Sequence, residues 1–299
     1  MHKPVLLNEV LEYLDPKPGQ SFIDATLDGG GHALAILERV LPEGKVLGIE
    51  WDPKMLKDFN AKISDSAFKE EVGKSLFAVQ GSYVDLERIA DDQGIVPKGI
   101  LFDLGLSSWH YEESGRGFSF QKPDEPLDMR FDPNQGQLAS SLINTILIQE
   151  LERILSEYGE EQFSKSITEA IGEMRKKKPI VVVGDLLEAI EGAVPKWYKH
   201  RKIHWATKTF QALRIAVNNE LENVAAGMEA AIRLLPPKGR LAVISFQGLE
   251  DKIVREIFKA KAKEKVISWV KRATIRPAWD EIKENPRARS AKMKVIQKI

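Results

Sequence analysis

The chain has 299 residues, of which 43% are hydrophobic and 29% charged, and its 44 Lys/Arg balance its 44 Asp/Glu. This composition is typical of a globular protein with two domains or one enlarged domain, and it excludes a disordered chain. The absence of cysteine excludes disulfides, thiolate metal sites and cysteine nucleophiles, and no apolar stretch approaches the ~18 residues that span a bilayer. We therefore expect a cytoplasmic protein with no membrane partner.

The first hundred residues alternate between apolar runs and amphipathic segments. The runs, which resemble buried parallel strands, occupy residues 21–25, 46–50, 75–79 and 99–103. Helical spacing covers residues 8–14, 33–41, 53–63 and 83–92. This alternation predicts a parallel sheet with helices on both faces.

The alternation stops after Asp103. A loop rich in glycine and proline is followed by helical patterns at residues 138–145, 148–158, 161–175 and 184–193, and only residues 180–183 resemble a strand. One long helix is predicted next, on an apolar stripe of Phe210, Leu213, Val217, Leu221, Val224, Met228 and Ile232. A strand at 240–246, a helix from Leu249 and final strands at 267–271 and 292–297 complete the pattern. The economical model is an α/β domain of residues 1–112 and 205–299, interrupted by a mainly helical domain of residues 113–204.

The most informative segment is FIDATLDGGGH, residues 22–32. An apolar run ends at Asp24, and three glycines then precede a helical pattern. Glycines let the backbone approach a ligand, and a helix N-terminus offers free N–H groups. The segment therefore predicts a cradle for a nucleotide-type cofactor, and an ordinary turn is the alternative.

Spacing separates the cofactor classes. A dinucleotide fingerprint needs a glycine three residues after the second glycine of its pair, but Leu34 stands three residues past Gly31. The second strand ends in Glu50, 19 residues past Gly31, where a carboxylate accepts from ribose hydroxyls. The arrangement resembles the first motif of S-adenosylmethionine-dependent methyltransferases.

The fourth predicted strand ends in a similar pattern, ILFDLGLSSWH, residues 100–110. Apolar residues lead to Asp103, and the polar pair Ser107-Ser108 follows. Ligands of doubly wound sheets bind at the carboxyl edge of the strands, where an acid can orient an amine and take its proton. The alternative is that Asp103 only caps the following loop.

RGFSF and PLDMRF, within residues 116–131, combine arginines with aromatics in a long loop, and loops of this length are usually functional or disordered. Two basic segments favour a nucleic-acid partner. KWYKHRKIHW, residues 196–205, interleaves four cations with three aromatics. Residues 252–298 hold 15 Lys/Arg and 5 Asp/Glu, a net charge of +10. Solvated basic helix faces are the alternative. His200 and His204 lack a third ligand, so no metal site is predicted.

Taken together, the motifs closely resemble those of the bacterial small-subunit (16S) ribosomal RNA cytosine-N4 methyltransferase family, RsmH or MraW, over almost the full length. The carriers are HKPVLLNEV (2–10), DATLDGGGH (24–32), DLGLSS (103–108), RGFSF (116–120), PLDMR (126–130), YGEE (158–161), ATKTFQALRIAVNNEL (206–221), SFQGLED (245–251) and ENPRARS (284–290).

The resemblance implies a class I, Rossmann-like methyltransferase fold with an inserted helical domain on the RNA-substrate side. It implies methyl transfer from S-adenosylmethionine to N4 of a cytidine near the decoding centre, in ribosomal RNA or the assembled small subunit. Asp103 is the expected catalytic residue. The family's cofactor contacts fall on Gly30, Gly31, His32, Glu50, Tyr83, Asp103 and His110.

Further candidates are expected to contact RNA: Ser107, Ser108, Arg116, Arg130, Lys199, Arg201, Trp205, Gln247, Arg287 and Arg289. The chain departs from the family pattern at Glu50, usually Asp, at Tyr83, often Phe, and at His110, commonly Gln. The largest departure is Gln247-Gly248, where His-Ser is usual. Two other functions stay open: a non-catalytic RNA-binding protein on a degenerate methyltransferase fold, and an NAD-dependent oxidoreductase.

Overall fold

The computed structural model describes residues 4–299, so His2 of the first motif lies outside the described part. The chain forms two compact units. One comprises the described part of Met1–Gly105 together with Leu221–Ile299, and the other is Leu106–Glu220. The expected helical insertion, residues 113–204, falls within the second unit, whose bounds are wider on both sides.

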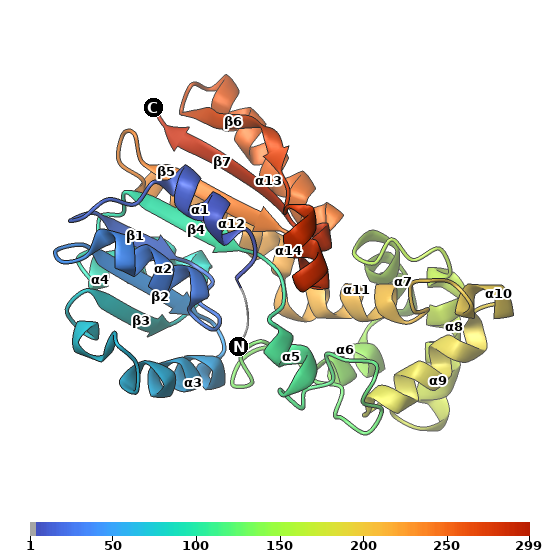
Figure 1. Ribbon diagram of the computed structural model, residues 1–299. Coiled ribbons are helices and arrows are strands. Elements are labelled where there is room, and N and C mark those ends of the chain that lie inside the picture. The colour runs from blue at the N-terminus through green and yellow to red at the C-terminus, as the bar shows by residue number, and fades with distance from the viewer. Residues whose placement is uncertain (1–3) are drawn as a thin grey trace. The chain divides into compact units, whose positions relative to one another are not determined.

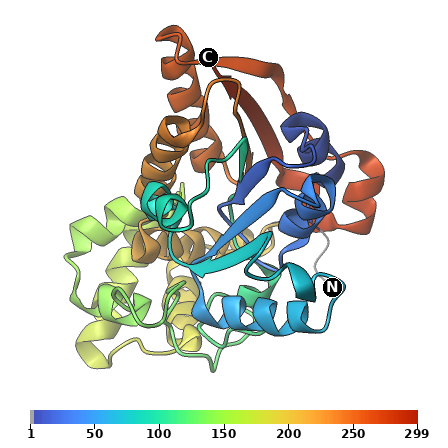
Figure 2. The ribbon, with the colours of Figure 1, turned by 90° about the vertical axis from the view of Figure 1, so that its left-hand side faces the viewer.

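The first unit is built on a seven-stranded sheet of order β3-β2-β1-β4-β5-β7-β6. Five strands are parallel: β1 (Ser21–Asp24), β2 (Lys45–Glu50), β3 (Leu76–Gln80), β4 (Gly99–Asp103) and β5 (Arg240–Ser245). The late strand β7 (Lys292–Lys298) lies antiparallel between β5 and the edge strand β6 (Ile267–Ile275). Figures 1 and 2 show these strands side by side. This is the predicted α/β sheet, including the strands that were predicted near the end of the chain.

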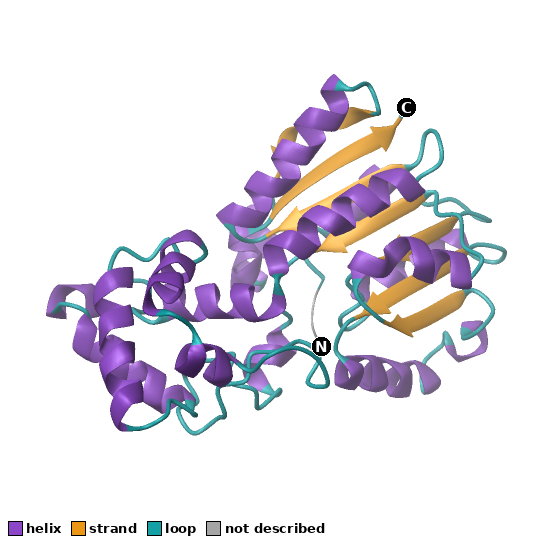
Figure 3. Cartoon of the chain, turned by 180° about the vertical axis from the view of Figure 1, so that it is seen from behind, coloured by secondary structure: helices purple, strands orange, loops and turns teal. Residues whose placement is uncertain are grey.

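Helices cover both faces of the sheet. Because neighbouring strand residues point to opposite faces, Phe22 belongs to one core and Ile23 to the other. The first face is covered by α1 (Leu7–Leu14), α2 (Gly31–Val40) and α3 (Pro53–Ser64). The second is covered by α4 (Leu86–Asp92), α12 (Glu220–Leu234) and α13 (Gly248–Lys263), and Figure 3 shows the chain from behind. The segment predicted as one helix at 83–92 begins with a 3-10 turn, η2 (Tyr83–Asp85).

The second unit is helical and has its own hydrophobic core. Its helices are α5 (Ser108–Glu112), α6 (Ala139–Thr145), α7 (Ile148–Glu157), α8 (Ser164–Lys177), α9 (Val183–Ala193), α10 (Lys196–Lys199) and α11 (Thr207–Asn218). The remaining short elements of the chain are η1 (Lys69–Glu71), α14 (Trp279–Glu284) and η3 (Pro286–Ser290).

Two sequence predictions are wrong. The long helix is divided at Asn219, whose φ of 49° is left-handed, a conformation that asparagine tolerates better than most residues. Residues 180–183 form no strand. The Ile180 backbone instead exchanges hydrogen bonds with the Asn144 side chain, and Val182 makes only an isolated bridge to Pro126.

The core of the first unit provides a stability test. Phe22 is fully buried in β1, so Phe22→Ala is expected to destabilise this unit by about 3–5 kcal/mol through lost burial and a cavity. Native-state hydrogen exchange of the β1 and β4 amides measures this. Val96→Ala is the control, because Val96 is 73% exposed and its truncation is expected to change stability by less than about 0.5 kcal/mol. Equal protection in Phe22→Ala and wild type would contradict the assignment of Phe22 to this core.

Candidate active site

The turn from β1 to α2 is organised by Asp24. This carboxylate ends β1, is buried, and accepts hydrogen bonds from the backbone N–H and the hydroxyl of Thr26 at 3.2 and 3.5 Å. Gly30 follows in the left-handed region, with φ 76°, and α2 begins at Gly31. The strand, glycines and helix therefore occur in the order that the sequence predicts.

The glycines make room for protein side chains. A Cβ at Gly30 would lie 2.1 Å from the Phe59 ring, and one at Gly31 would lie 3.0 Å from Pro4. A Cβ at Gly29 would meet nothing within 4 Å. Gly30 and Gly31 thus allow α2 to pack closely on its neighbours, and Gly29 is the glycine whose Cβ position is open. Close approach to a ligand was predicted for all three glycines.

Glu50 is fixed at the carboxyl end of β2. Its Oε2 accepts the backbone N–H of Asp28, and its Oε1 accepts that of Asp52, both at 2.9 Å. Asp28 itself has a left-handed φ of 46° in the glycine turn. The carboxylate is therefore oriented by two backbone groups, and each oxygen retains a lone pair for a further donor such as a hydroxyl.

Asp103 ends β4, the strand beside β1. Its backbone N–H donates to Thr26 Oγ1 at 2.7 Å, and its Oδ2 lies 3.7 Å from His32 Nδ1. The other ring nitrogen of His32, Nε2, donates to the Val5 carbonyl at 2.9 Å. Asp103 Oδ1 is buried and has no hydrogen-bond partner among residues 4–299. This oxygen is an acceptor available to a ligand.

Four acids share this edge of the sheet. Burial raises the pKa of Asp24 and that of Glu50 to about 7 each. Burial, followed by repulsion from neighbouring carboxylates, raises the pKa of Asp28 and of Asp103 well above the ordinary value. Within the described chain, none of the four forms an ion pair with a lysine or arginine. Such a cluster favours a cationic ligand, which would stabilise the ionised carboxylates.

Tyr83 forms an aromatic wall in the same unit. Its ring meets Phe102 edge-on with centroids 5.4 Å apart, and Trp51 at 6.5 Å. A Cβ at Gly227 of α12 would lie 2.6 Å from the Tyr83 ring. The ring is therefore held in place by close packing.

Gln247 stands after β5, immediately before α13. Its Nε2 donates to Glu250 Oε1 at 2.7 Å, while its Oε1 is buried without a partner in the described residues. Glu250 Oε2 accepts the backbone N–H of Phe246 at 3.2 Å, and the Glu250 carboxylate contributes to the raised pKa of Asp103. Neither Glu250 nor Asp28 was predicted from the sequence, although Glu250 is detectable as the acid three residues after a helix N-cap.

The remaining predicted cofactor contact, His110, belongs to the second unit. It is buried in α5 among the rings of Trp109, Phe118 and Phe131, at centroid distances of 5.1–5.4 Å. Its contact with the cofactor stays a prediction. Ser107, the N-cap of α5, is buried, and Ser108 is half-buried.

Two arginines predicted to contact RNA hold their own loop together. Arg116 is buried, donates to the carbonyls of Arg130 and Phe131 at 2.8 Å, and stacks on Trp109. Arg130 forms a bidentate pair with Asp128, at 2.7 and 3.0 Å. These contacts favour a structural role over direct phosphate contact for both side chains.

The other RNA candidates are more accessible. Arg201 is exposed above the Tyr198 ring, Lys199 pairs with Glu191 at 3.1 Å, and Trp205 is half-buried against His204. Arg287 and Arg289 are exposed on η3, in the first unit. Among the described residues, no group of three or more His, Asp or Glu side chains is placed to bind a metal ion.

The sheet and the carboxylate-lined edge define a class I methyltransferase fold, as predicted. A family model, "MraW methylase family", matches residues 1–299, so the chain belongs to this methylase family. S-Adenosylmethionine is accordingly its cofactor, and the cation-favouring cluster of Asp24, Asp28, Glu50 and Asp103 suits its sulfonium and ammonium charges.

Relatives cover nearly the whole chain. "Ribosomal RNA small subunit methyltransferase H" of Dictyoglomus thermophilum is 42% identical over 296 residues, which is 99% of this chain and 96% of the relative. The protein of that name from Thermomicrobium roseum is 40% identical over 314 residues, covering 100% and 94%. A solved rRNA methylase from Streptococcus thermophilus has a TM-score of 0.45 and 10% identity, covering 100% of this chain and 99% of that one. In the described chain, no helix is long and apolar enough to cross a membrane.

The raised pKa values predict how stability depends on pH. A carboxyl whose pKa rises on folding binds more protons in the folded state, so its contribution to stability is full below about pH 4 and declines until about pH 7. We expect the free energy of unfolding of the cofactor-free protein to fall across this window, and Asp24→Asn to remove on the order of 4 kcal/mol of that fall.

Thermal unfolding in buffers from pH 4 to pH 8 measures this slope. The control is Asp65→Asn, which changes an exposed carboxyl outside the site. An Asp24→Asn slope equal to that of wild type would show that Asp24 titrates normally in the folded protein.

Proposed function

We propose that this chain transfers a methyl group from S-adenosylmethionine to the exocyclic N4 of a cytidine in small-subunit ribosomal RNA, near the decoding centre. The observation that carries the proposal is the buried, unpartnered Oδ1 of Asp103 beside a carboxylate cluster suited to a cation. The names of the relatives support the RNA substrate. The proposal that the acceptor is a cytosine is supported by the motifs DLGLSS and SFQGLED and by the chemistry of Asp103.

The first unit supplies the cofactor site. S-Adenosylmethionine supplies an electrophilic methyl group on a sulfonium sulfur. Glu50 holds the ribose hydroxyls, the Tyr83 wall packs against an aromatic ring, and the buried acids balance positive charge. Gly29 to His32 place the start of α2 beside these groups. His110 completes the proposed set of contacts.

Asp103 is the proposed catalytic residue. The cytosine amine is a poor nucleophile because its lone pair is conjugated with the ring, so positioning supplies much of the acceleration. The ionised Asp103 accepts an N4–H hydrogen bond and takes the proton that N4 loses as its new bond to carbon forms. A raised pKa makes this carboxylate a stronger base.

Gln247 provides a second acceptor. Its amide is oriented by Glu250, which leaves Oε1 buried and unpartnered. We place the second N4–H hydrogen on this oxygen. An amide can hold and orient this hydrogen, but it cannot act as a base, so the proton transfer falls to Asp103 alone.

The RNA reaches the site as an unstacked strand. Single-stranded nucleotides can leave their stack at modest cost, which lets one cytidine enter a pocket. Ser107, Ser108 and Lys199 to Trp205 in the helical unit, and Arg287 and Arg289 in the first, are proposed to hold the surrounding RNA. We place the reaction in the cytoplasm, on ribosomal RNA or the assembled small subunit.

One rival function has a specific observation in its favour. Gln247-Gly248 replaces the usual His-Ser pair, as expected of an RNA-binding protein that has lost catalysis. Incubation with labelled S-adenosylmethionine and small ribosomal subunits, followed by mass spectrometry of the nucleosides, separates the two functions. N4-Methylcytidine supports the enzyme, and an unlabelled RNA supports the rival.

Asp103→Ala is expected to lower kcat by at least about 10²-fold, because it removes both the positioning acceptor and the base. The assay is methyl transfer to small subunits, with circular dichroism to confirm the fold. Asp103→Asn keeps the shape and is expected to be similarly impaired, while Asp65→Asn retains wild-type turnover. Near-normal methylation by Asp103→Ala would exclude this residue from catalysis.

Gln247→Leu is expected to lower kcat about tenfold, the effect of one lost hydrogen bond to a neutral group, and to change S-adenosylmethionine affinity less than twofold. Gln247→His is the matched variant, since an imidazole nitrogen can also accept a hydrogen bond. We expect it to keep most of the activity. If Gln247→Leu turns over like wild type while folding normally, the second acceptor lies elsewhere.

A further inference from the structure

The segment between β6 and β7 lies at the same edge of the sheet as the candidate site. Ile275, the last residue of β6, pairs with Met293, and Lys292 of β7 pairs with Ser245, the last residue of β5. β5 in turn runs parallel to β4, which ends at Asp103. Residues 276–291, with α14 and η3, therefore begin and end at the carboxyl edge of the parallel strands (Figure 1).

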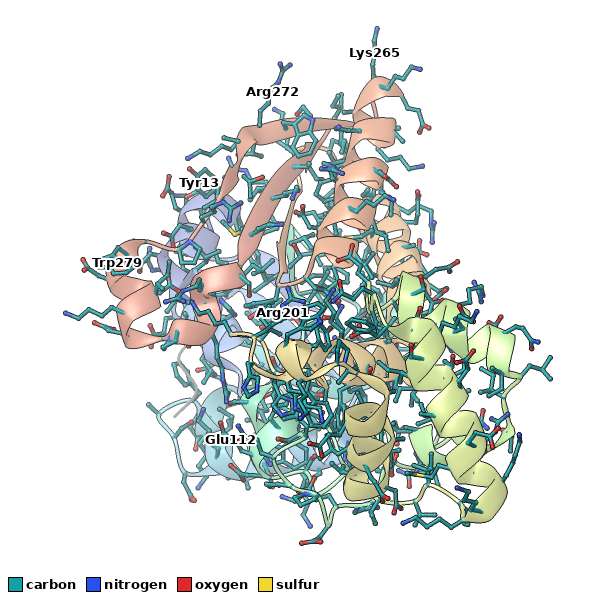
Figure 4. The ribbon with its side chains drawn as sticks, turned by 90° about the vertical axis from the view of Figure 1, so that its right-hand side faces the viewer. Tyr13, Glu112, Arg201, Lys265, Arg272 and Trp279 are labelled. Carbon is teal, nitrogen blue, oxygen red and sulfur yellow. The ribbon has the colours of Figure 1, made fainter. Side chains whose placement is uncertain are left out.

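This segment exposes a large aromatic side chain. Trp279, the first residue of α14, is 71% exposed, and Figure 4 shows its side chain on the outside of that helix. Its indole contacts no other aromatic ring within the described chain. Trp279 does not anchor the segment. Ile275 and Ala288 do so, because both are buried in the hydrophobic core.

Unpaired cations surround the tryptophan in sequence. Arg276, Lys283 and Arg289 are exposed, and none forms an ion pair in the part of the chain that the structure describes. Two other exposed arginines of this unit are paired, Arg88 with Asp92 and Arg233 with Glu87. Arg39, Arg255 and Arg272 are exposed and form no ion pair among the described residues, so what distinguishes this segment is the combination of such cations with an exposed tryptophan. From Lys271 to Lys292 there are seven Lys/Arg and three Asp/Glu, so the segment remains cationic despite Asp280, Glu281 and Glu284.

The segment is fixed to the neighbourhood of the site. Glu281 Oε1 accepts the backbone N–H of Leu6 at 2.8 Å, and the adjacent Val5 carbonyl accepts from His32, whose other ring nitrogen faces Asp103. Asn285 caps η3 by accepting the backbone N–H of Arg287. Trp279 and its cations are thus presented by anchored backbone, so little further ordering is needed when a ligand binds.

We propose that Trp279, Arg276, Lys283 and Arg289, here called the α14 platform, bind the single-stranded ribosomal RNA that flanks the target cytidine. A base stacks on the indole, and the cations neutralise the adjoining phosphates. This inference rests on the proposed function and deepens it, because it adds an RNA contact outside the reacting centre. Exposed tryptophan and arginine also occur at protein interfaces, but unpaired cations at the substrate edge of an RNA-modifying enzyme favour RNA.

Fluorescence anisotropy with a labelled single-stranded RNA 20-mer of mixed sequence tests the platform in the full chain. We expect Trp279→Ala to weaken binding about tenfold and Trp279→Phe to keep most of it, because phenylalanine also stacks. Arg276→Ala/Arg289→Ala is expected to reduce the slope of log affinity against log salt by about 1.4, at 0.7 per phosphate contact. Lys17→Ala/Lys98→Ala, at the opposite edge of the sheet, is the charge-matched control and is expected to leave the slope unchanged.

Three further measurements separate this proposal from the proposed function. Trp279→Ala and Arg276→Ala/Arg289→Ala are expected to bind S-adenosylmethionine like wild type and to raise the KM for small subunits without lowering kcat, whereas the Lys17→Ala/Lys98→Ala control keeps the wild-type KM. If wild type makes N4-methylcytidine but Trp279→Ala binds RNA normally, the platform is overturned and the enzyme stands. If wild type transfers no label, the enzyme fails, and a Trp279-dependent RNA affinity would still support the platform. Loss of self-association in Trp279→Ala, measured by sedimentation with RNA affinity unchanged, would overturn the platform in favour of a protein interface.

Discussion

The concentration of buried and half-buried carboxylates at one edge of the sheet is the constraint on which the site depends. Asp24, Asp28, Glu50 and Asp103 lie at or just beyond strand ends, where parallel strands bring their carboxyl termini together. Burial penalises their ionisation and mutual repulsion adds to the penalty, so their pKa values rise. A ligand with two positive charges relieves both penalties. The same arrangement that disfavours charge in the free protein therefore suits a cationic ligand such as the methyl donor better than a neutral nucleoside or a pyrophosphate.

Much of this edge could be predicted from the sequence because its signals are local. The apolar run before Asp24, the glycines after it and the acid ending the next strand each reflect a short stretch of backbone. The need for glycine at positions 30 and 31 could not be predicted in this way, because it arises from close packing against Phe59 and Pro4, which are distant in the sequence. Likewise, the motifs around Arg116 and Arg130 indicated RNA contact, but carbonyls and Asp128 from their own loop occupy both side chains.

The errors in the helical unit have a common cause. The apolar stripe from Phe210 to Ile232 continues through Asn219 without a break in period, so hydrophobic spacing predicts one helix. The interruption is tertiary. Asn218 donates to the Met129 carbonyl and accepts the Phe131 N–H, while Arg214 forms a buried pair with Glu220. The two bonds of Asn218 join it to backbone groups that lie 87 and 89 residues away in the sequence. Residues 180–183 were mispredicted for a similar reason. The side chain of Asn144 takes the backbone hydrogen bonds of Ile180 that a neighbouring strand would otherwise make.

The position of β7 has a consequence for biogenesis. This strand is the last in chain order, yet it lies between β5 and β6, and the sheet is incomplete without it. Synthesis from the N-terminus therefore delivers β1 to β5 and the whole helical unit before residues 292–298 exist. The helical unit, Leu106–Glu220, is a continuous segment, so all of its core residues are made before β7. The sheet that carries the carboxylate cluster is therefore completed after every residue of the helical unit has been synthesised.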